Sequence, residues 1–116
     1  MLGELVTEAH SKRAEYGRRR KAYDEETFEE PLRSTRESEG WQLVRENKSS
    51  VRMRKPKSFD EVLENRFWSI LYRFGYPELN LGRNFKIQVG KGSQAIEKQI
   101  DVFAKDDETV VVAECK

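Results

Sequence analysis

The sequence contains one cysteine and one histidine, and these shortages exclude several kinds of site. A lone cysteine, Cys115, cannot form a disulfide within the chain. With His10 as the only histidine, neither a zinc cluster nor a histidine-based catalytic triad can be assembled. Because no histidine lies near it in the sequence, Cys115 is expected to be a small buried residue and not a nucleophile.

Long hydrophobic runs are also missing. No stretch approaches the roughly 18 apolar residues that a membrane-spanning helix requires. The N-terminal sequence MLGELVTEAHSKR lacks the apolar segment of a secretory signal peptide. We therefore expect a cytoplasmic protein with no membrane partner.

Charged residues make up 37% of the 116 residues and hydrophobic residues 36%, so part of the chain is expected to remain in solvent. The length predicts one compact domain with appended segments. The net charge of +1 gives no overall signature of polyanion binding. Positive charge is instead concentrated in residues 45–57, which hold six basic residues and one acid, so any nucleic acid should bind locally. The candidate nucleic-acid contacts in this basic run are Lys48, Arg52, Arg54, Lys55 and Lys57.

The first 40 residues are expected to form a helical and linker extension. Residues 4–22 combine helix-forming residues with many charges, which predicts a solvated helix with little to bury. Residues 23–40 mix acidic residues with Pro31 and end on Gly40, a pattern typical of a short helical or disordered stretch followed by a linker.

Residues 41–116 are expected to form the folded core. Alternating apolar and polar residues predict two short strands between residues 41 and 57. Apolar residues at helical spacing predict a helix that begins at Ser58, a good N-cap, and ends at Gly75. Three strands joined by tight turns should follow, at residues 85–89, 94–105 and 109–115.

Three polar residues on the last two of these strands form the strongest candidate site. Side chains alternate along a strand, so Glu114 and Lys116 project to the same side, roughly 6.6 Å apart. The short turn at residues 106–108 should pair the two strands and bring Asp101 close to Glu114. Two carboxylates on rigid strands suit Mg²⁺, and a neighbouring lysine can hold or deprotonate an attacking water.

This pattern resembles the motif of the PD-(D/E)XK nucleases, the restriction-endonuclease-like superfamily. In that motif a strand aspartate is followed, on the next strand, by an acid, any residue and a lysine, here Asp101, Glu114 and Lys116. The proline that names the motif is replaced by Ile100. The resemblance implies phosphodiester hydrolysis dependent on Mg²⁺ or Mn²⁺. It implies Asp101 and Glu114 as metal ligands, with the Cys115 backbone carbonyl as a third. Lys116 would position the water.

The same family often has a glutamate in the helix before the strands. Glu64 in LENRFWSILYRFGY matches this glutamate. Glu61 is the alternative match, but it could serve only to cap the start of the helix. The resemblance covers roughly residues 59–116 and implies an α/β fold with a restriction-endonuclease-like core, a helix followed by a three-stranded meander. More narrowly, the segment from Trp41 onward looks like the N-terminal part of proteins with a DGQHR-type domain, linked to DNA modification and restriction.

The family core continues with a further helix and strand after the motif lysine. We therefore expect the chain to be a C-terminally incomplete part of a longer parent protein with further domains. The intact parent is the expected enzyme, and the missing elements leave open whether this segment is active alone.

Two functions remain open at this point. The first is a Mg²⁺-dependent DNA endonuclease domain of a restriction, defence or DNA-modification system, for which a homodimer is plausible because cutting both strands usually takes two sites. The second is a noncatalytic nucleic-acid-binding or assembly module on the same fold. Each feature also has an ordinary explanation, since strands often end in Glu and Lys for solubility and a basic run is often a solvated surface.

Overall fold

The computed structural model describes residues 3–115 and is a mixed α/β structure with antiparallel sheets. Its residues group into two compact units. One contains the chain up to Arg20 and from Asp60 onward, and the other contains residues 21–59. The boundary expected at residue 40 falls inside the second unit. Within the described residues, no helix combines the length and apolar character needed to cross a membrane.

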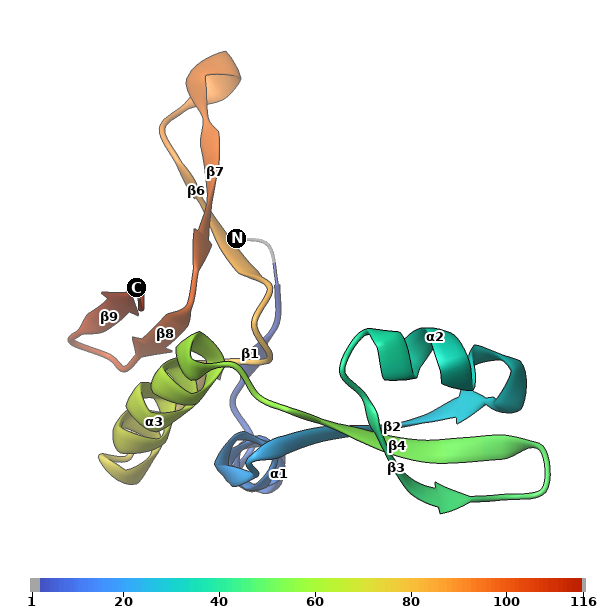
Figure 1. Cartoon of the computed structure of the whole chain (residues 1–116). Coiled ribbons are helices and arrows are strands. Elements are labelled where there is room, and N and C mark those ends of the chain that lie inside the picture. The colour runs from blue at the N-terminus through green and yellow to red at the C-terminus, as the bar shows by residue number, and fades with distance from the viewer. Residues whose placement is uncertain (1–2, 116) are drawn as a thin grey trace. The chain divides into compact units, whose positions relative to one another are not determined.

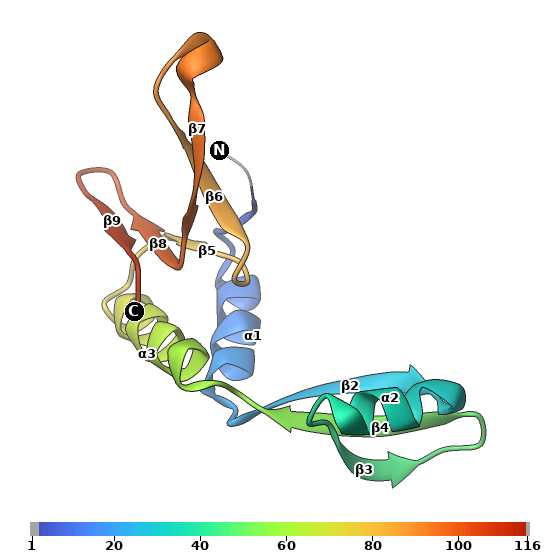
Figure 2. The same cartoon turned by 45° about the horizontal axis from the view of Figure 1, so that its top comes forward.

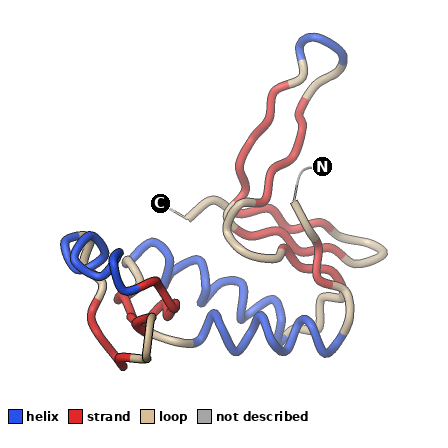
Figure 3. Tube along the Cα trace, turned by 90° about the vertical axis from the view of Figure 1, so that its right-hand side faces the viewer, coloured by secondary structure: helices blue, strands red, loops and turns tan. Residues whose placement is uncertain are grey.

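The larger unit is built around a four-stranded antiparallel sheet in the order β1-β5-β8-β9 (Figure 1). Its strands are β1 (Leu5–Val6), β5 (Glu78–Asn80), β8 (Val102–Lys105) and β9 (Val110–Ala113). Two further strands, β6 (Phe85–Val89) and β7 (Ile96–Ile100), pair only with each other among the described strands. They form a hairpin ribbon that extends away from the sheet (Figures 2 and 3).

Two helices, α1 (Ala9–Arg20) and α3 (Phe59–Arg73), lie side by side against this sheet (Figure 2). Tyr16 of α1 stacks on Tyr72 of α3 with ring centroids 4.6 Å apart. The helix predicted between Ser58 and Gly75 is therefore confirmed as α3. Gly75 has a φ of 92°, a left-handed conformation that glycine adopts without the steric cost of a Cβ atom.

The main core of the larger unit lies between α3 and the sheet. It is formed by Trp68, Leu71, Leu79, Val102 and Ala104. A second small cluster of Phe85, Ile100 and Phe103 lies at the base of the hairpin ribbon, where the rings of Phe85 and Phe103 are 4.9 Å apart. Alternation along β8 explains the two clusters, because Phe103 points away from the side of its neighbours Val102 and Ala104.

The predicted strand at residues 94–105 is wrong as one continuous element. The chain bends at Asp101, so β7 pairs with β6 while β8 pairs with β5 and β9. The side chain of Asn80 stabilises the bend, since its amide nitrogen donates to the Asp101 backbone oxygen and its amide oxygen accepts from the Phe103 N–H. The predicted meander of residues 85–89, 94–105 and 109–115 is therefore wrong in its first strand, because β6 pairs with β7 while the neighbour of β8 in the sheet is β5. The β6–β7 ribbon lies between β5 and β8 in the chain.

The N-terminal helix is shorter than predicted, and the expectation that it has little to bury is wrong. Glu15 and Arg19, one turn apart on α1, are both buried. They form an ion pair with Nε of Arg19 3.1 Å from Oε2 of Glu15. Opposite charges four residues apart can be buried together because each satisfies the other.

The smaller unit is a three-stranded antiparallel sheet in the order β2-β4-β3 with a short helix. Its elements are β2 (Tyr23–Glu29), a 3-10 turn (Glu30–Leu32), α2 (Arg33–Ser38), β3 (Gln42–Glu46) and β4 (Ser50–Pro56). The two strands predicted between residues 41 and 57 are confirmed. The prediction that residues 23–40 are helical or disordered is wrong for the first part of this stretch, which forms the strand β2. Pairing with β4 in register along its length, and contact of Phe28 with Trp41, outweigh its acidic composition.

Candidate active site

Asp101 and Glu114 lie at the same end of the β8–β9 pair. The last residues paired there are Val102 and Ala113, so Asp101 comes directly before this pair and Glu114 directly after it. The backbone N–H of Cys115 donates to Oδ2 of Asp101 at 2.8 Å. The expected proximity of Asp101 to Glu114 and Cys115 is therefore present in the backbone arrangement.

Glu64 on α3 faces the same region and is held by an arginine. Its carboxylate accepts hydrogen bonds from Nε and Nη2 of Arg83 at 2.8 and 2.9 Å. Arg83 lies in the loop between β5 and β6, and its Nη1 is also 3.6 Å from Oε1 of Glu61. Both glutamates considered from the sequence thus face Arg83, but only Glu64 makes the two-pronged contact.

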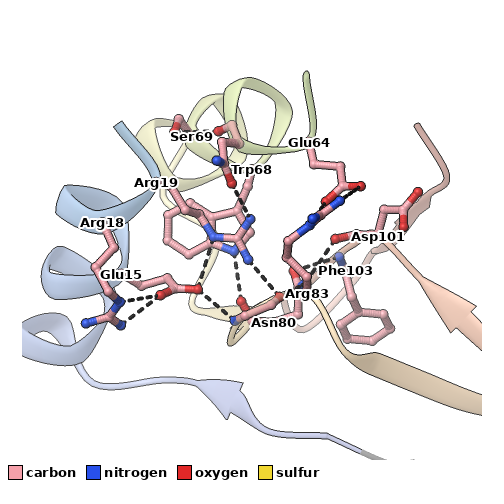
Figure 4. A network of polar contacts seen from close by, with 12 residues as sticks. Glu15, Arg18, Arg19, Glu64, Trp68, Ser69, Asn80, Arg83, Asp101 and Phe103 are labelled. Atoms are coloured by element: carbon pink, nitrogen blue, oxygen red, sulfur yellow. Dashed lines mark hydrogen bonds and ion pairs between the residues drawn. The ribbon is translucent and has the colours of Figure 1, made fainter. Parts of the chain in front are cut away.

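The charges of Glu64 and Asp101 act on two common neighbours, Arg83 and Cys115. Figure 4 shows Glu64, Arg83 and Asp101. The hydrogen bond to Glu64 raises the pKa of Arg83 above its ordinary value, and the negative charges of Glu64, Glu61 and Asp101 act in the same direction. Burial raises the pKa of the Cys115 thiol, and the charges of Asp101 and Glu64 raise it further. Cys115 is therefore held as a neutral thiol at neutral pH, but it is only half-buried, not the fully buried small residue that was predicted.

Glu114 is oriented toward the hairpin ribbon. Its Oε1 is 3.3 Å from Nζ of Lys98 on β7, and about a third of its side chain is exposed, 32%. Its predicted partner in the motif, Lys116, lies outside the described residues. The carboxylates of Glu64 and Asp101, which both act on Arg83, are called the acidic cluster. Glu114 contacts a different cation, Lys98.

Asn80 supports the acidic cluster from β5. It is fully buried, donates from Nδ2 to the backbone oxygens of Gly82 and Asp101 at 3.1 Å each, and accepts from the Phe103 N–H at 3.0 Å. Its own backbone oxygen accepts from Nε1 of Trp68 at 2.9 Å. Asn80 thus fixes the bend at which Asp101 lies.

The buried ion pair of α1 holds the loop that carries Arg83. The Gly82 N–H donates to Oε2 of Glu15 at 2.7 Å, and Nη2 of Arg19 donates to the Gly82 oxygen at 2.9 Å. Nη1 of Arg19 also donates to Oδ1 of Asn65 on α3 at 3.0 Å. A segment expected to be an appendage therefore helps to position the cluster.

The donor atoms of the cluster suit a hard cation in chemical type, because Mg²⁺ and Mn²⁺ prefer carboxylate and carbonyl oxygens. Asp101, Glu114 and the Cys115 backbone carbonyl supply only oxygen donors. Among residues 3–115, however, no three Asp, Glu, His or Cys side chains are grouped closely enough to hold a metal ion. Arg83 and Lys98 occupy oxygens of Glu64 and Glu114, and these are the contacts that a metal ion would have to replace.

The predicted nucleic-acid contacts are divided between faces of the smaller unit. Cross-strand partners share a face of a sheet, and Arg52 is paired with Thr27 and Arg45, while Arg54 is paired with Glu25 and Gln42. Arg45, Arg52 and Arg54 therefore project from one face, which we call the arginine face. Lys55 follows Arg54 on β4 and projects from the opposite face. Lys48 lies in the loop between β3 and β4, and Lys57 follows β4.

Sequence reasoning missed Arg83, Asn80, Arg45 and the Glu15–Arg19 pair. Only the pair had a usable signal, a glutamate four residues before an arginine on a predicted helix. The β8–β9 pairing next to the motif residues agrees with the last turn of the expected meander, but its expected first strand, residues 85–89, is β6 of the separate hairpin ribbon. Searches of protein-family models, curated proteins and solved structures found no match to this chain, so these residues and their geometry carry the functional argument.

Proposed function

We propose that this chain carries part of the active site of a Mg²⁺- or Mn²⁺-dependent DNA endonuclease with a restriction-endonuclease-like core. The observation that supports this most directly is the antiparallel β8–β9 pair, which brings Asp101 and Glu114 to the same end of these two strands, where the Cys115 N–H contacts Asp101. The helix α3 comes before this pair in the chain, as the motif resemblance implies. The substrate is a DNA phosphodiester bond.

The residues have separate roles in this proposal. Asp101 and Glu114, with the Cys115 backbone carbonyl, hold the divalent ion, which supplies charge stabilisation and an activated water when bound. The Cys115 N–H orients the Asp101 carboxylate through Oδ2. Glu64 supplies a further carboxylate, for which the ion would compete with Arg83, and Lys116 positions the attacking water.

The proposed setting is a cytoplasmic restriction, defence or DNA-modification system. Further domains of a longer protein would select the target, and a homodimer would allow both strands to be cut. These assignments rest on the motif resemblance. They also rest on two tasks that a single cleavage site does not perform, namely target selection and cutting of the second strand.

Cleavage that depends on a divalent ion is the expected result of a direct test. Supercoiled plasmid DNA is incubated with the complete protein, in molar excess over DNA and at physiological ionic strength, with MgCl₂, MnCl₂ or EDTA. We expect nicked and linear DNA with either metal and none with EDTA, with activity restored when Mg²⁺ is added back. Equal cutting by the complete protein in EDTA, or no cutting by it with either metal, would contradict the proposal.

A noncatalytic nucleic-acid-binding module is the second candidate, and the arginine face supports it. Arg45 and Arg54 are exposed and Arg52 is 37% exposed along its side chain. The guanidinium of Arg54 lies 4.3 Å from the centroid of the Tyr23 ring, and Arg52 contacts Glu25 and Thr27. Guanidinium groups projecting from one open sheet face suit contacts to a phosphate backbone.

Replacing all three arginines of this face by glutamine is expected to weaken DNA binding about tenfold and to flatten its dependence on salt concentration. Fluorescence anisotropy with a labelled duplex at several salt concentrations measures both effects. The matched control replaces Lys48, Lys55 and Lys57 by glutamine, which removes the same charge from other positions. Equal weakening in both triple variants would show that net charge, and not the arginine face, determines binding.

A further inference from the structure

Arg83 is the cation that pairs with Glu64 of the acidic cluster. Its guanidinium donates in parallel to both carboxylate oxygens of Glu64, at 2.8 and 2.9 Å, and its remaining terminal nitrogen is 3.6 Å from Glu61. The Glu64 side chain is only 5% exposed, whereas that of Arg83 is 44% exposed. The carboxylate is therefore nearly enclosed, and both of its oxygens accept from this more exposed guanidinium, as the dashed lines in Figure 4 show.

The fold fixes the backbone that carries Arg83. The Gly82 N–H donates to Glu15, and the Gly82 oxygen accepts from Arg19 and Asn80. The backbone oxygen of Arg83 itself accepts from Nε2 of Gln99 at 3.1 Å. Four side chains from α1, β5 and β7 thus hold the two residues, so the position of the guanidinium is built into the larger unit.

A guanidinium and a divalent ion cannot use the same carboxylate oxygens at once. Both oxygens of Glu64 accept from Arg83, and Asp101 lies within electrostatic reach of the same guanidinium. We infer that Arg83 is a built-in counter-ion that competes with a divalent metal for the acidic cluster and thereby lowers the affinity for the metal. This inference rests on the proposed metal-dependent function.

The competition should appear directly in metal binding. Mn²⁺ is titrated into the full chain, and free Mn²⁺ is measured by electron paramagnetic resonance. We expect Arg83→Gln to bind Mn²⁺ about tenfold more tightly than the wild type, because removing one cation from a cluster of carboxylates favours another. Arg66→Gln, which removes an equal charge from an exposed position of α3, should leave the affinity unchanged.

A double-mutant cycle identifies the contested carboxylate. In a Glu64→Gln background, most of the gain from Arg83→Gln should disappear, because the oxygens that the arginine blocks are no longer charged. Arg83→Lys keeps the charge but cannot make the two-pronged contact, so its affinity should lie between those of the wild type and Arg83→Gln. This variant also keeps the test usable if the glutamine variant unfolds.

The contact can also be followed by nuclear magnetic resonance in the wild type, and a variant is then needed only to assign the signal. The Nε–H signal of Arg83 in nitrogen-proton correlation spectra, assigned by its absence in Arg83→Lys, should shift as Mg²⁺ is added. If the wild type binds Mn²⁺ with the same affinity as Arg83→Gln and this signal does not move, the inference is wrong while the metal site stands. If neither protein binds Mn²⁺, the proposed function itself is wrong.

Discussion

Replacing Asp101 by asparagine is expected to reduce metal-dependent DNA cleavage by roughly a thousandfold or more, because a charged ligand of the ion is lost. Asparagine has the shape of aspartate, and its amide oxygen can still accept the hydrogen bond that the Cys115 N–H now donates to Oδ2. The substitution therefore removes the charge while the backbone arrangement of the β8–β9 end is kept. Initial rates of plasmid nicking with Mg²⁺ measure the effect.

Asp107→Asn is the matched control for this variant. Asp107 is an exposed aspartate in the turn between β8 and β9, so the control removes the same charge from the same hairpin. Asp106 is unsuitable because its carboxylate accepts from the Glu108 and Thr109 N–H groups and orders the turn. We expect Asp107→Asn to cut DNA at the rate of the wild type. Wild-type cutting by Asp101→Asn would remove Asp101 from the site and leave the binding module as the better proposal.

The strongest local patterns in the sequence predicted the elements that carry the motif. The apolar spacing of α3 and its end at Gly75 depend on residues close in sequence, and so do the valine-rich β9 and the hairpin pairing that brings Asp101 near Glu114. Local propensity and tertiary structure agree at these places. The β1 and β5 strands, by contrast, are two and three residues long and too short to show an alternating pattern.

The remaining errors come from contacts between residues far apart in the sequence. The bend at Asp101 depends on Asn80, which is 21 residues away, so the continuous apolar pattern around it suggested one strand. Arg83 is placed by Glu15 and Arg19 through Gly82, and no spacing rule connects α1 with that loop. A helix rich in charged residues is normally exposed to solvent. The burial of the Glu15–Arg19 pair follows only from its contacts with residues distant in the sequence.

The Glu15–Arg19 pair should make a large contribution to the stability of the larger unit. Replacing Glu15 by alanine is expected to lower the free energy of unfolding by about 3 kcal/mol, because Arg19 and the Gly82 N–H lose their buried acceptor. Glu97→Ala, an exposed glutamate on β7 of the same unit, should change it by less than about 0.5 kcal/mol. Urea unfolding in a Trp41→Phe background measures the difference, since Trp68 then reports on the unit that contains Glu15.

The contribution of Glu15 should also depend on pH. Burial alone would raise the pKa of Glu15, but the Gly82 N–H hydrogen bond and the charges of Arg19 and Arg18 outweigh it, so the pKa in the folded protein lies below the ordinary value of 4.5. A carboxylate with a depressed pKa stabilises the fold fully above its unfolded value and loses this contribution as the pH falls through the folded one. The stability difference between wild type and Glu15→Ala should therefore be constant down to about pH 5 and shrink at lower pH. A difference that is absent at pH 7, or that grows on acidification, would mean that the pair does not hold α1 against the loop of Arg83.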